Sequence, residues 1–200
     1  MARRTTISQD DILEAARSLF LEKGLDVPTA EIARKAGVSE GSIFRRFPTK
    51  QELFFAAMGL EGGPPWAKEL EQLPGGDLQE QLANLAVRVI ETFREMLPRM
   101  MMVWSCRGMN ISTIRDVHSK FPRHAVEALT DFIDRQMLAG KMRVGHPEIV
   151  SRIFLGSAFN YVFLETMGVE VRGPLDVKTY ATSLVNTLWH GVAPQAERAK

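Results

Sequence analysis

The chain of 200 residues is long enough to bury one or two hydrophobic cores. Its composition, with 45% hydrophobic and 24% charged residues, excludes a disordered protein. The net charge of +1 gives no general attraction to nucleic acid, but nine of the 25 Lys and Arg residues lie in the first 50 positions, where bases outnumber acids. The single cysteine, Cys106, excludes an internal disulfide, which fits a cytoplasmic protein. No run of about 18 apolar residues predicts a membrane span, and we expect no signal peptide because the first residues lack an apolar segment.

The first 55 residues predict a compact three-helix unit that runs into a fourth helix. Ser8 is placed to cap a helix with apolar residues at every third or fourth position, and Gly24 is placed to end it. Thr29 begins a short second helix. Gly37 ends that helix and can adopt the left-handed backbone conformation that a sharp reversal needs.

The second and third helices, with the glycine turn between them, predict a helix-turn-helix. Ser39 is placed to cap the third helix, which is barely two turns long, and Pro48 ends it. Thr49 and Glu52 have the spacing of a capping box for the fourth helix.

The third helix is expected to bury one side and to expose the other. The inward positions are Val38, Ile43 and Phe47, and the outer or flanking ones are Glu40, Gly41, Ser42, Arg45 and Arg46. Small residues near its start would let this helix enter a DNA major groove. Arginine is the usual bidentate reader of guanine and also binds phosphate, so the sequence leaves open which arginine does which. A structural helix-turn-helix with a solvated arginine pair is the alternative.

The stretch from Thr29 to Phe54, TAEIARKAGVSEGSIFRRFPTKQELF, strongly resembles the helix-turn-helix signature of the TetR (tetracycline repressor-like) family of bacterial transcription regulators. The matching positions are Thr29, Ile32, Ala33, Ala36, Gly37, Val38, Ser39, Phe44, Phe47, Pro48, Lys50, Leu53 and Phe54. The resemblance implies an all-α protein of about nine helices. It also implies a DNA-binding domain over residues 1–55 and a helical effector-binding and dimerisation domain over residues 56–200.

The resemblance also implies the residues that bind DNA. Thr29 and Lys50, which begin the second and fourth helices, are expected to hold phosphates, and Ser42 to lie against a phosphate or a base edge. Phe44 stands where the family usually has tyrosine, and it lacks the tyrosine hydroxyl that would donate to a phosphate. Arg46 is a candidate to replace this phosphate contact. The predicted set is Thr29, Ser39, Glu40, Gly41, Ser42, Phe44, Arg45, Arg46 and Lys50, with Arg3 and Arg4 as a mobile arm.

Residues 60–77 are rich in Gly and Pro and predict a loop with a short helical piece. Asp77 and Glu80 then have capping-box spacing for a helix with a broad apolar stripe. That stripe comprises Leu78, Leu82, Leu85, Ala86, Val89, Phe93 and Leu97. The stretch that follows, LPRMMMVWSCRGMN, is rich in methionine, which suits either an adaptable ligand pocket or an irregular core.

In TetR-like proteins the central helices enclose a ligand cavity, so the resemblance implies a pocket for a small hydrophobic effector. Its predicted lining is Trp66, Phe93, Met101, Trp104, Met109, Asn110, Phe159 and Phe163, with Asn110 or Asn160 as the polar group.

Two further helices are predicted at the C-terminal end. Pro147 is placed at the start of one that Gly168 ends, and Pro174 or Asp176 opens another that ends near Gly191. Both are apolar around more than one stripe, which suits burial within a monomer or packing on a partner. The resemblance implies the second arrangement, a four-helix dimer interface that lets two reading helices bind a pseudo-palindromic operator. The predicted interface residues are Phe154, Ala158, Tyr161, Tyr180, Leu184 and Leu188.

A catalytic function finds little support in the sequence. Cys106 with His118 or His124 would supply a nucleophile and a base, but Cys106 lies in an apolar run with no orienting group. The four histidines lack metal-ligand spacing, so we predict no enzyme, metal or cofactor. The predicted function is a cytoplasmic, dimeric repressor that a ligand releases from DNA. The alternative is a helical ligand-binding or enzymatic protein whose helix-turn-helix no longer reads DNA.

Overall fold

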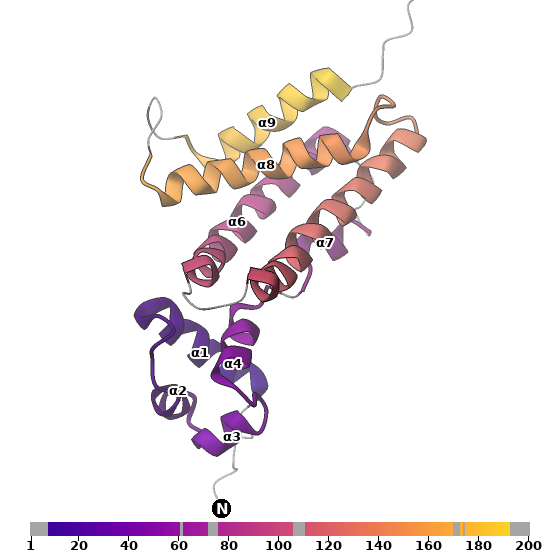
Figure 1. The fold of residues 1–200 in the computed structure, drawn as a ribbon. Coiled ribbons are helices and arrows are strands. Elements are labelled where there is room, and N and C mark those ends of the chain that lie inside the picture. Colours follow the sequence, from indigo (N-terminus) through magenta and orange to yellow (C-terminus); the bar gives the residue numbers. More distant parts are fainter. Residues whose placement is uncertain are drawn as a thin grey trace, which may run out of the picture. The chain divides into compact units, whose positions relative to one another are not determined.

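The computed structural model describes residues 8–60, 62–71, 76–105, 111–169, 173 and 175–192, without the side chains of residues 111–118, 191 and 192. These residues form nine α-helices and no strand (Figure 1), which confirms the predicted all-α class. In chain order the helices are α1 (Gln9–Lys23), α2 (Thr29–Ala36), α3 (Glu40–Phe44), α4 (Lys50–Met58), α5 (Pro65–Glu69), α6 (Leu78–Ser105), α7 (Ile111–Leu138), α8 (Pro147–Thr166) and α9 (Val177–Val192). None of the helices, as far as they are described, has the length and apolar character needed to cross a membrane.

Side-chain caps set the starts of α1 and α4, as the sequence predicts. The Ser8 hydroxyl accepts from the Asp11 amide at 3.1 Å, and the Asp11 carboxylate accepts from the Ser8 amide at 2.8 Å. This capping box holds the pKa of the Asp11 carboxyl below its usual range. The Thr49 hydroxyl accepts from the Glu52 amide at 3.1 Å and donates to the Glu52 carboxylate at 3.2 Å.

The chain forms two units, Met1–Gly62 with Pro98–Lys120 and Gly63–Leu97 with Phe121–Lys200. It passes from one to the other after Gly62, within α6 at Pro98, and within α7 at Phe121, next to Pro122. The predicted division of roles at residue 55 stays a prediction.

In the first unit α1 packs against both α2 and α4. Phe20 and Phe54 are fully buried and meet edge to face, with ring centroids 5.1 Å apart. The Arg17 side chain donates from Nε to the carbonyl oxygen of Ala57 at 2.7 Å, which ties the end of α4 to α1. The rest of this core includes Ile12, Ala16, Leu19, Ile32, Ala33, Ile43, Phe47, Leu53 and Met58.

In the second unit α8 and α9 lie side by side (Figure 1) and two tyrosines join them. The Tyr180 hydroxyl on α9 donates to the carbonyl of Ser157 at 2.8 Å. The Tyr161 hydroxyl on α8 donates to the carbonyl of Leu175, just before α9, at 2.5 Å. Burial raises the pKa of both tyrosines, so both hydroxyls keep their protons at neutral pH.

The predicted apolar stripe of α6 faces the interior, because all its members are buried except the half-buried Phe93. No bounds are predicted from the sequence for α7, and this helix continues through Pro122. Among the side chains of α7 that the structure describes, the buried ones are Phe121, Ala125, Leu129, Phe132, Ile133 and Met137.

An ion pair joins α6 to α8 in the second unit. Arg94 donates from Nε and Nη2 to the two carboxylate oxygens of Glu165, each at 2.7 Å. These bonds hold the pKa of Glu165 below its usual range and raise the pKa of Arg94. The pair therefore stabilises the fold above the unfolded-state pKa of a glutamate, about 4.3, and this stabilisation is lost as the pH falls through the lowered pKa of folded Glu165.

Replacing Glu165 by glutamine is expected to lower the free energy of unfolding at pH 7 by less than about 1 kcal/mol, because both side chains are partly exposed. The difference from the wild type should shrink as the pH falls below about 4. Urea unfolding over a range of pH measures it. Glu148→Gln, in the more exposed pair with Arg152, is the comparison and is expected to have the smaller effect at pH 7. An equal loss in both variants would contradict a specific role for the Arg94 pair.

Candidate nucleic-acid interface

The α3 helix is built by its cap and by the turn before it. The Ser39 hydroxyl accepts from the Ser42 amide at 3.2 Å and lies 2.9 Å from the Ser42 hydroxyl. Gly37, which ends α2, has φ 71° and ψ 28°. Side chains are strained in this left-handed conformation, so the reversal between α2 and α3 depends on glycine.

Two buried side chains hold α3 to its unit. Ile43 is fully buried and Phe47 is 6% exposed, and the Phe47 amide donates to the Ile43 carbonyl at 2.8 Å. Val38, which was also expected to pack inward, is half-buried. The helix packs against α2, and its remaining side chains are directed away from the core.

Most of the predicted DNA-binding residues are accessible. The exposed ones are Ser39, Glu40, Gly41, Phe44, Arg45 and Arg46. Ser42 and Lys50 are half-buried, and Thr29, the first residue of α2, is 8% exposed. Arg3 and Arg4 lie outside the described residues. The DNA contacts assigned to all these residues stay predictions.

The arginine pair has no acidic partner among the described residues. Arg45 donates from Nη2 to the Ser42 hydroxyl over a long 3.5 Å, and the Arg46 side chain forms no ion pair within the described part of the chain. Each guanidinium therefore keeps donors available for an anion or a base edge from outside the protein.

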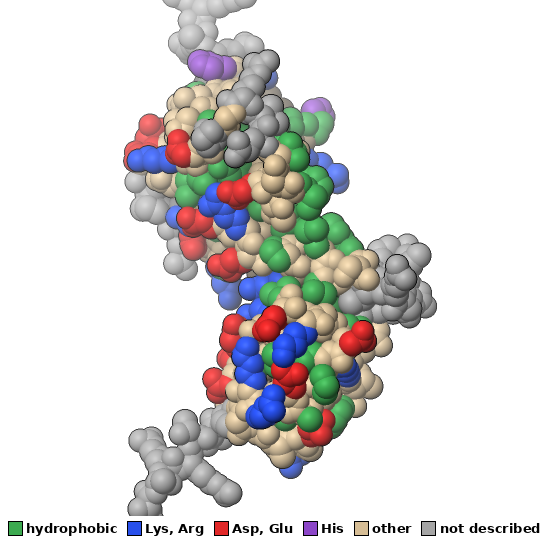
Figure 2. Space-filling view, turned by 90° about the vertical axis from the view of Figure 1, so that its left-hand side faces the viewer, with side chains coloured by type: hydrophobic (Ala, Val, Ile, Leu, Met, Phe, Trp, Pro, Cys, Tyr) green, Lys and Arg blue, Asp and Glu red, His purple; other side chains and the backbone are tan. Residues whose placement is uncertain are grey.

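Basic side chains do not form a broad patch on the face that Figure 2 shows. Lys and Arg side chains there alternate with Asp and Glu on the N-terminal part of the molecule. On this face, therefore, no general positive field points to DNA, and an assignment to DNA depends on the particular donors of α3.

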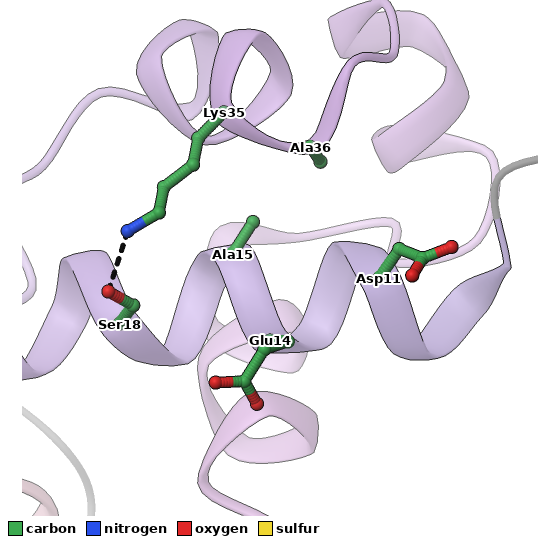
Figure 3. Close-up of a pocket in the computed structure, with 6 residues that line it drawn as sticks. All are labelled: Asp11, Glu14, Ala15, Ser18, Lys35 and Ala36. Atoms are coloured by element: carbon green, nitrogen blue, oxygen red, sulfur yellow. Dashed lines mark hydrogen bonds between the residues drawn. The ribbon is translucent and has the colours of Figure 1, made fainter.

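A groove of about 460 Å³ lies between α1 and α2 (Figure 3). Lys35 reaches across it and donates from Nζ to the Ser18 hydroxyl at 2.6 Å. Asp11 and Glu14 also line the groove, and their carboxylates would repel phosphate. None of the predicted DNA-binding residues lines it, so the groove is not part of the candidate interface.

The predicted ligand-pocket residues are divided between the two units. Phe93, Phe159 and Phe163 meet in the second unit. The ring centroids of Phe93 and Phe159 are 5.6 Å apart, and those of Phe159 and Phe163 are 6.1 Å apart. Trp66 is 2% exposed in the same unit, whereas Met101 and the half-exposed Trp104 belong to the first. Met109 and Asn110 lie outside the described residues, and Asn160 is exposed. The pocket stays a prediction.

The predicted dimer residues differ in their surroundings. Phe154 and Ala158 are 2% and 0% exposed, so in this chain they lie inside the core of their own unit. The half-buried ones are Tyr161, Tyr180, Leu184 and Leu188. Their part in a dimer stays a prediction.

The sequence pattern missed the apolar residues that α8 exposes. Ile149 and Ile153 are 54% and 47% exposed, and Phe163 and Met167 continue the same face at helical spacing. Gly156 lies on this face, and a Cβ placed on it would meet no atom within 4 Å. Spacing alone could not reveal this face, because α8 is apolar on several sides.

The groups considered for catalysis are not assembled in the described part of the chain. Cys106 and the His118 side chain lie outside it, and His124 is exposed. No three His, Cys, Asp or Glu side chains gather where a metal ion would be held, among the residues that the structure describes.

Comparison with known proteins places the helix-turn-helix in a family. Residues 12–57 match the model described as bacterial regulatory proteins, tetR family. An uncharacterized HTH-type transcriptional regulator of Bacillus subtilis (strain 168), YvkB, is 28% identical over 151 residues, which are 75% of this chain and 78% of that protein.

Solved structures share the fold over nearly the whole chain. A protein of Mesorhizobium loti MAFF303099, assigned to the TetR-family transcriptional regulators, has a TM-score of 0.77 at 17% identity and covers 96% of this chain and 100% of its own. The transcriptional regulator FadR from Bacillus subtilis, solved with stearoyl-CoA, has a TM-score of 0.68 at 17% identity and covers 90% of this chain and 97% of its own. At these identities the likeness establishes the fold.

Proposed function

Because the chain belongs to the TetR family of bacterial transcriptional regulators, we propose that it is a repressor that binds a pseudo-palindromic operator as a homodimer. Each protomer places α3 in the major groove, and a small hydrophobic effector releases the complex. The protein acts in the cytoplasm and catalyses no reaction.

The observation that carries this proposal is the arginine pair at the end of α3. A short helix held by Ile43 and Phe47 presents Arg45 and Arg46 to solvent without an acidic partner in the described chain. A helix-turn-helix places its second helix in the major groove, where arginine recognises guanine and phosphate.

The exposed face of α8 supports the dimer. Exposed Ile149 and Ile153 would leave apolar surface in water, and a second copy related by a two-fold axis would cover it. Gly156 sits in the middle of this face although nothing in its own protomer comes near it. A glycine there lets the backbone of a partner helix come close.

The family and the neighbouring aromatic rings support a hydrophobic effector. Phe93, Phe159 and Phe163 form a partly accessible cluster between α6 and α8. A regulator of the same fold was solved with stearoyl-CoA, a ligand with a long acyl chain. Such an effector releases DNA only to the extent that it binds the DNA-free arrangement more tightly.

Selection of genomic DNA fragments by the purified wild-type protein tests the proposal. We expect enrichment of one sequence with two-fold symmetry, bound with a dissociation constant of about 10⁻⁸ M or tighter at physiological salt. Recovery of no enriched symmetric sequence would favour the alternative, a ligand-binding protein whose helix-turn-helix no longer reads DNA. Adding long-chain acyl compounds to the selected complex then tests the class of effector.

A further inference from the structure

We infer that Arg45 reads a guanine in each operator half-site, that Gly41 gives the clearance for that contact, and that Arg46 binds phosphate. The inference rests on the proposed function and divides between the two arginines a role that the sequence leaves open.

The first step is the direction in which each residue leaves α3. Successive residues of an α-helix turn by about 100°, so Gly41 and Arg45, each two positions from Ile43, both lie about 160° from it. Arg45 keeps a helical backbone, with φ −68° and ψ −29°. Because Ile43 is fully buried, Gly41 and Arg45 share the side that points away from the unit. That side is the one that reaches the base edges when the helix lies in a groove.

The second step concerns Gly41, for which the protein itself gives no reason. It lies inside α3 without a positive φ, and a Cβ placed on it would meet only the Ser39 hydroxyl, at 3.9 Å. Alanine would therefore fit and would favour the helix more than glycine does. Gly41 therefore lacks a side chain on the outward face of α3. This lets the helix backbone approach a base pair closely.

The third step separates the two arginines. Arg45 is one turn beyond Gly41 on the outward face, and its guanidinium lies 3.5 Å from the Ser42 hydroxyl, which leaves its other donors free for a base edge. Ser42 is itself linked to Ser39, the cap of the helix. The turn continues past α3 to Arg46, whose amide donates to the Ile43 carbonyl at 2.9 Å, so this residue lies about 60° from Ile43, nearer the buried side of the helix than Arg45. This flank faces the sugar-phosphate backbone when the outward face meets the bases.

Lysine variants distinguish the two roles, because lysine keeps the charge that binds phosphate but loses the bidentate fork that recognises guanine. We would select operators from randomised duplexes with wild type, Arg45→Lys and Arg46→Lys. The wild type should prefer guanine at one position in each half-site. Arg45→Lys should lose that preference and bind the wild-type operator at least ~10-fold more weakly. Arg46→Lys should keep the preference and bind within roughly threefold of the wild type.

Gly41→Ala tests the clearance independently. Its melting temperature, followed by circular dichroism, should equal or exceed that of the wild type, while operator affinity falls at least ~10-fold. Retention of the guanine preference by Arg45→Lys, its loss in Arg46→Lys, or wild-type affinity of Gly41→Ala would each overturn the inference. A wild type that selects a symmetric operator without guanine at this position would also overturn it, with the proposed function intact. A wild type that selects no sequence would sink the proposed function and this inference together.

Discussion

Replacing Arg45 and Arg46 together by alanine is expected to reduce operator binding to the level of binding to unrelated DNA, a loss of at least ~10³-fold. The proposed two-fold symmetric complex would lose four guanidinium groups, to which we assign base contacts and part of the phosphate contacts. The protein should stay folded and dimeric, because both side chains are exposed and pair with no acid in the described chain. Fluorescence anisotropy with operator and unrelated duplexes measures the loss.

The control for this experiment removes the same charge elsewhere. Arg135 and Lys141 are exposed in the second unit, on α7 and the turn that follows it. Replacing both with alanine removes two positive charges per protomer and should leave operator affinity within roughly threefold of the wild type at physiological salt. An equal loss in the control would mean that binding follows net charge, which would contradict a reading role for α3.

Placing glutamates at Ile149 and Ile153 is expected to convert the proposed dimer to a folded monomer. These side chains are about half exposed in the protomer, so the substitutions cost the isolated chain little. In the proposed dimer they would bring four carboxylates together without partners. Like charges forced together cost several kcal/mol, so the dimer dissociation constant should rise more than ~10³-fold. Sedimentation velocity measures the assembly state, and operator affinity should fall with it.

The control for this double variant changes another exposed apolar pair. Leu138, the last residue of α7, and Val144, which precedes α8, are each 82% exposed, and glutamate at both makes the same chemical change outside the α8 face. We expect this control to remain dimeric. If it dissociates while the α8 variant does not, the subunits meet at the turn between α7 and α8.

The helix-turn-helix could be predicted closely because its signals are local. Ser8 and Thr49 cap their helices through bonds within a few residues, and Gly37 ends α2 with the left-handed backbone that its lack of a side chain permits. Such signals require no knowledge of the rest of the fold. The motif around Arg45 and Arg46 was recognisable for the same reason.

The second half of the chain was harder to predict because its signals depend on tertiary contacts. A proline usually ends a helix, yet α6 continues past Pro98 and α7 past Pro122. Buried side chains on both sides of Pro122, including Phe121 and Ala125, stabilise α7 across the missing backbone bond. Hydrophobic periodicity predicted no bounds for α7, because the packing that stabilises this helix comes from contacts with other helices.

The face of α8 shows a related limit. Phe154 and Ile153 are adjacent and both apolar, but the first packs inside the unit and the second is exposed. A helix that is apolar on several sides offers no sequence signal for which side meets its own chain and which meets a partner. The predicted interface therefore included residues that the unit itself buries.

The attachment of α3 bears on how the family can diversify. Its packing depends on Ile43 and Phe47, whereas Gly41, Arg45 and Arg46 contribute little to the core. Mutations at those three positions should therefore be nearly neutral for folding while they change which DNA is recognised. A duplicated gene could drift to a new operator through them without a compensating change in the interior. For engineering, variants at the same three positions would make a small library, and all its members are expected to fold alike.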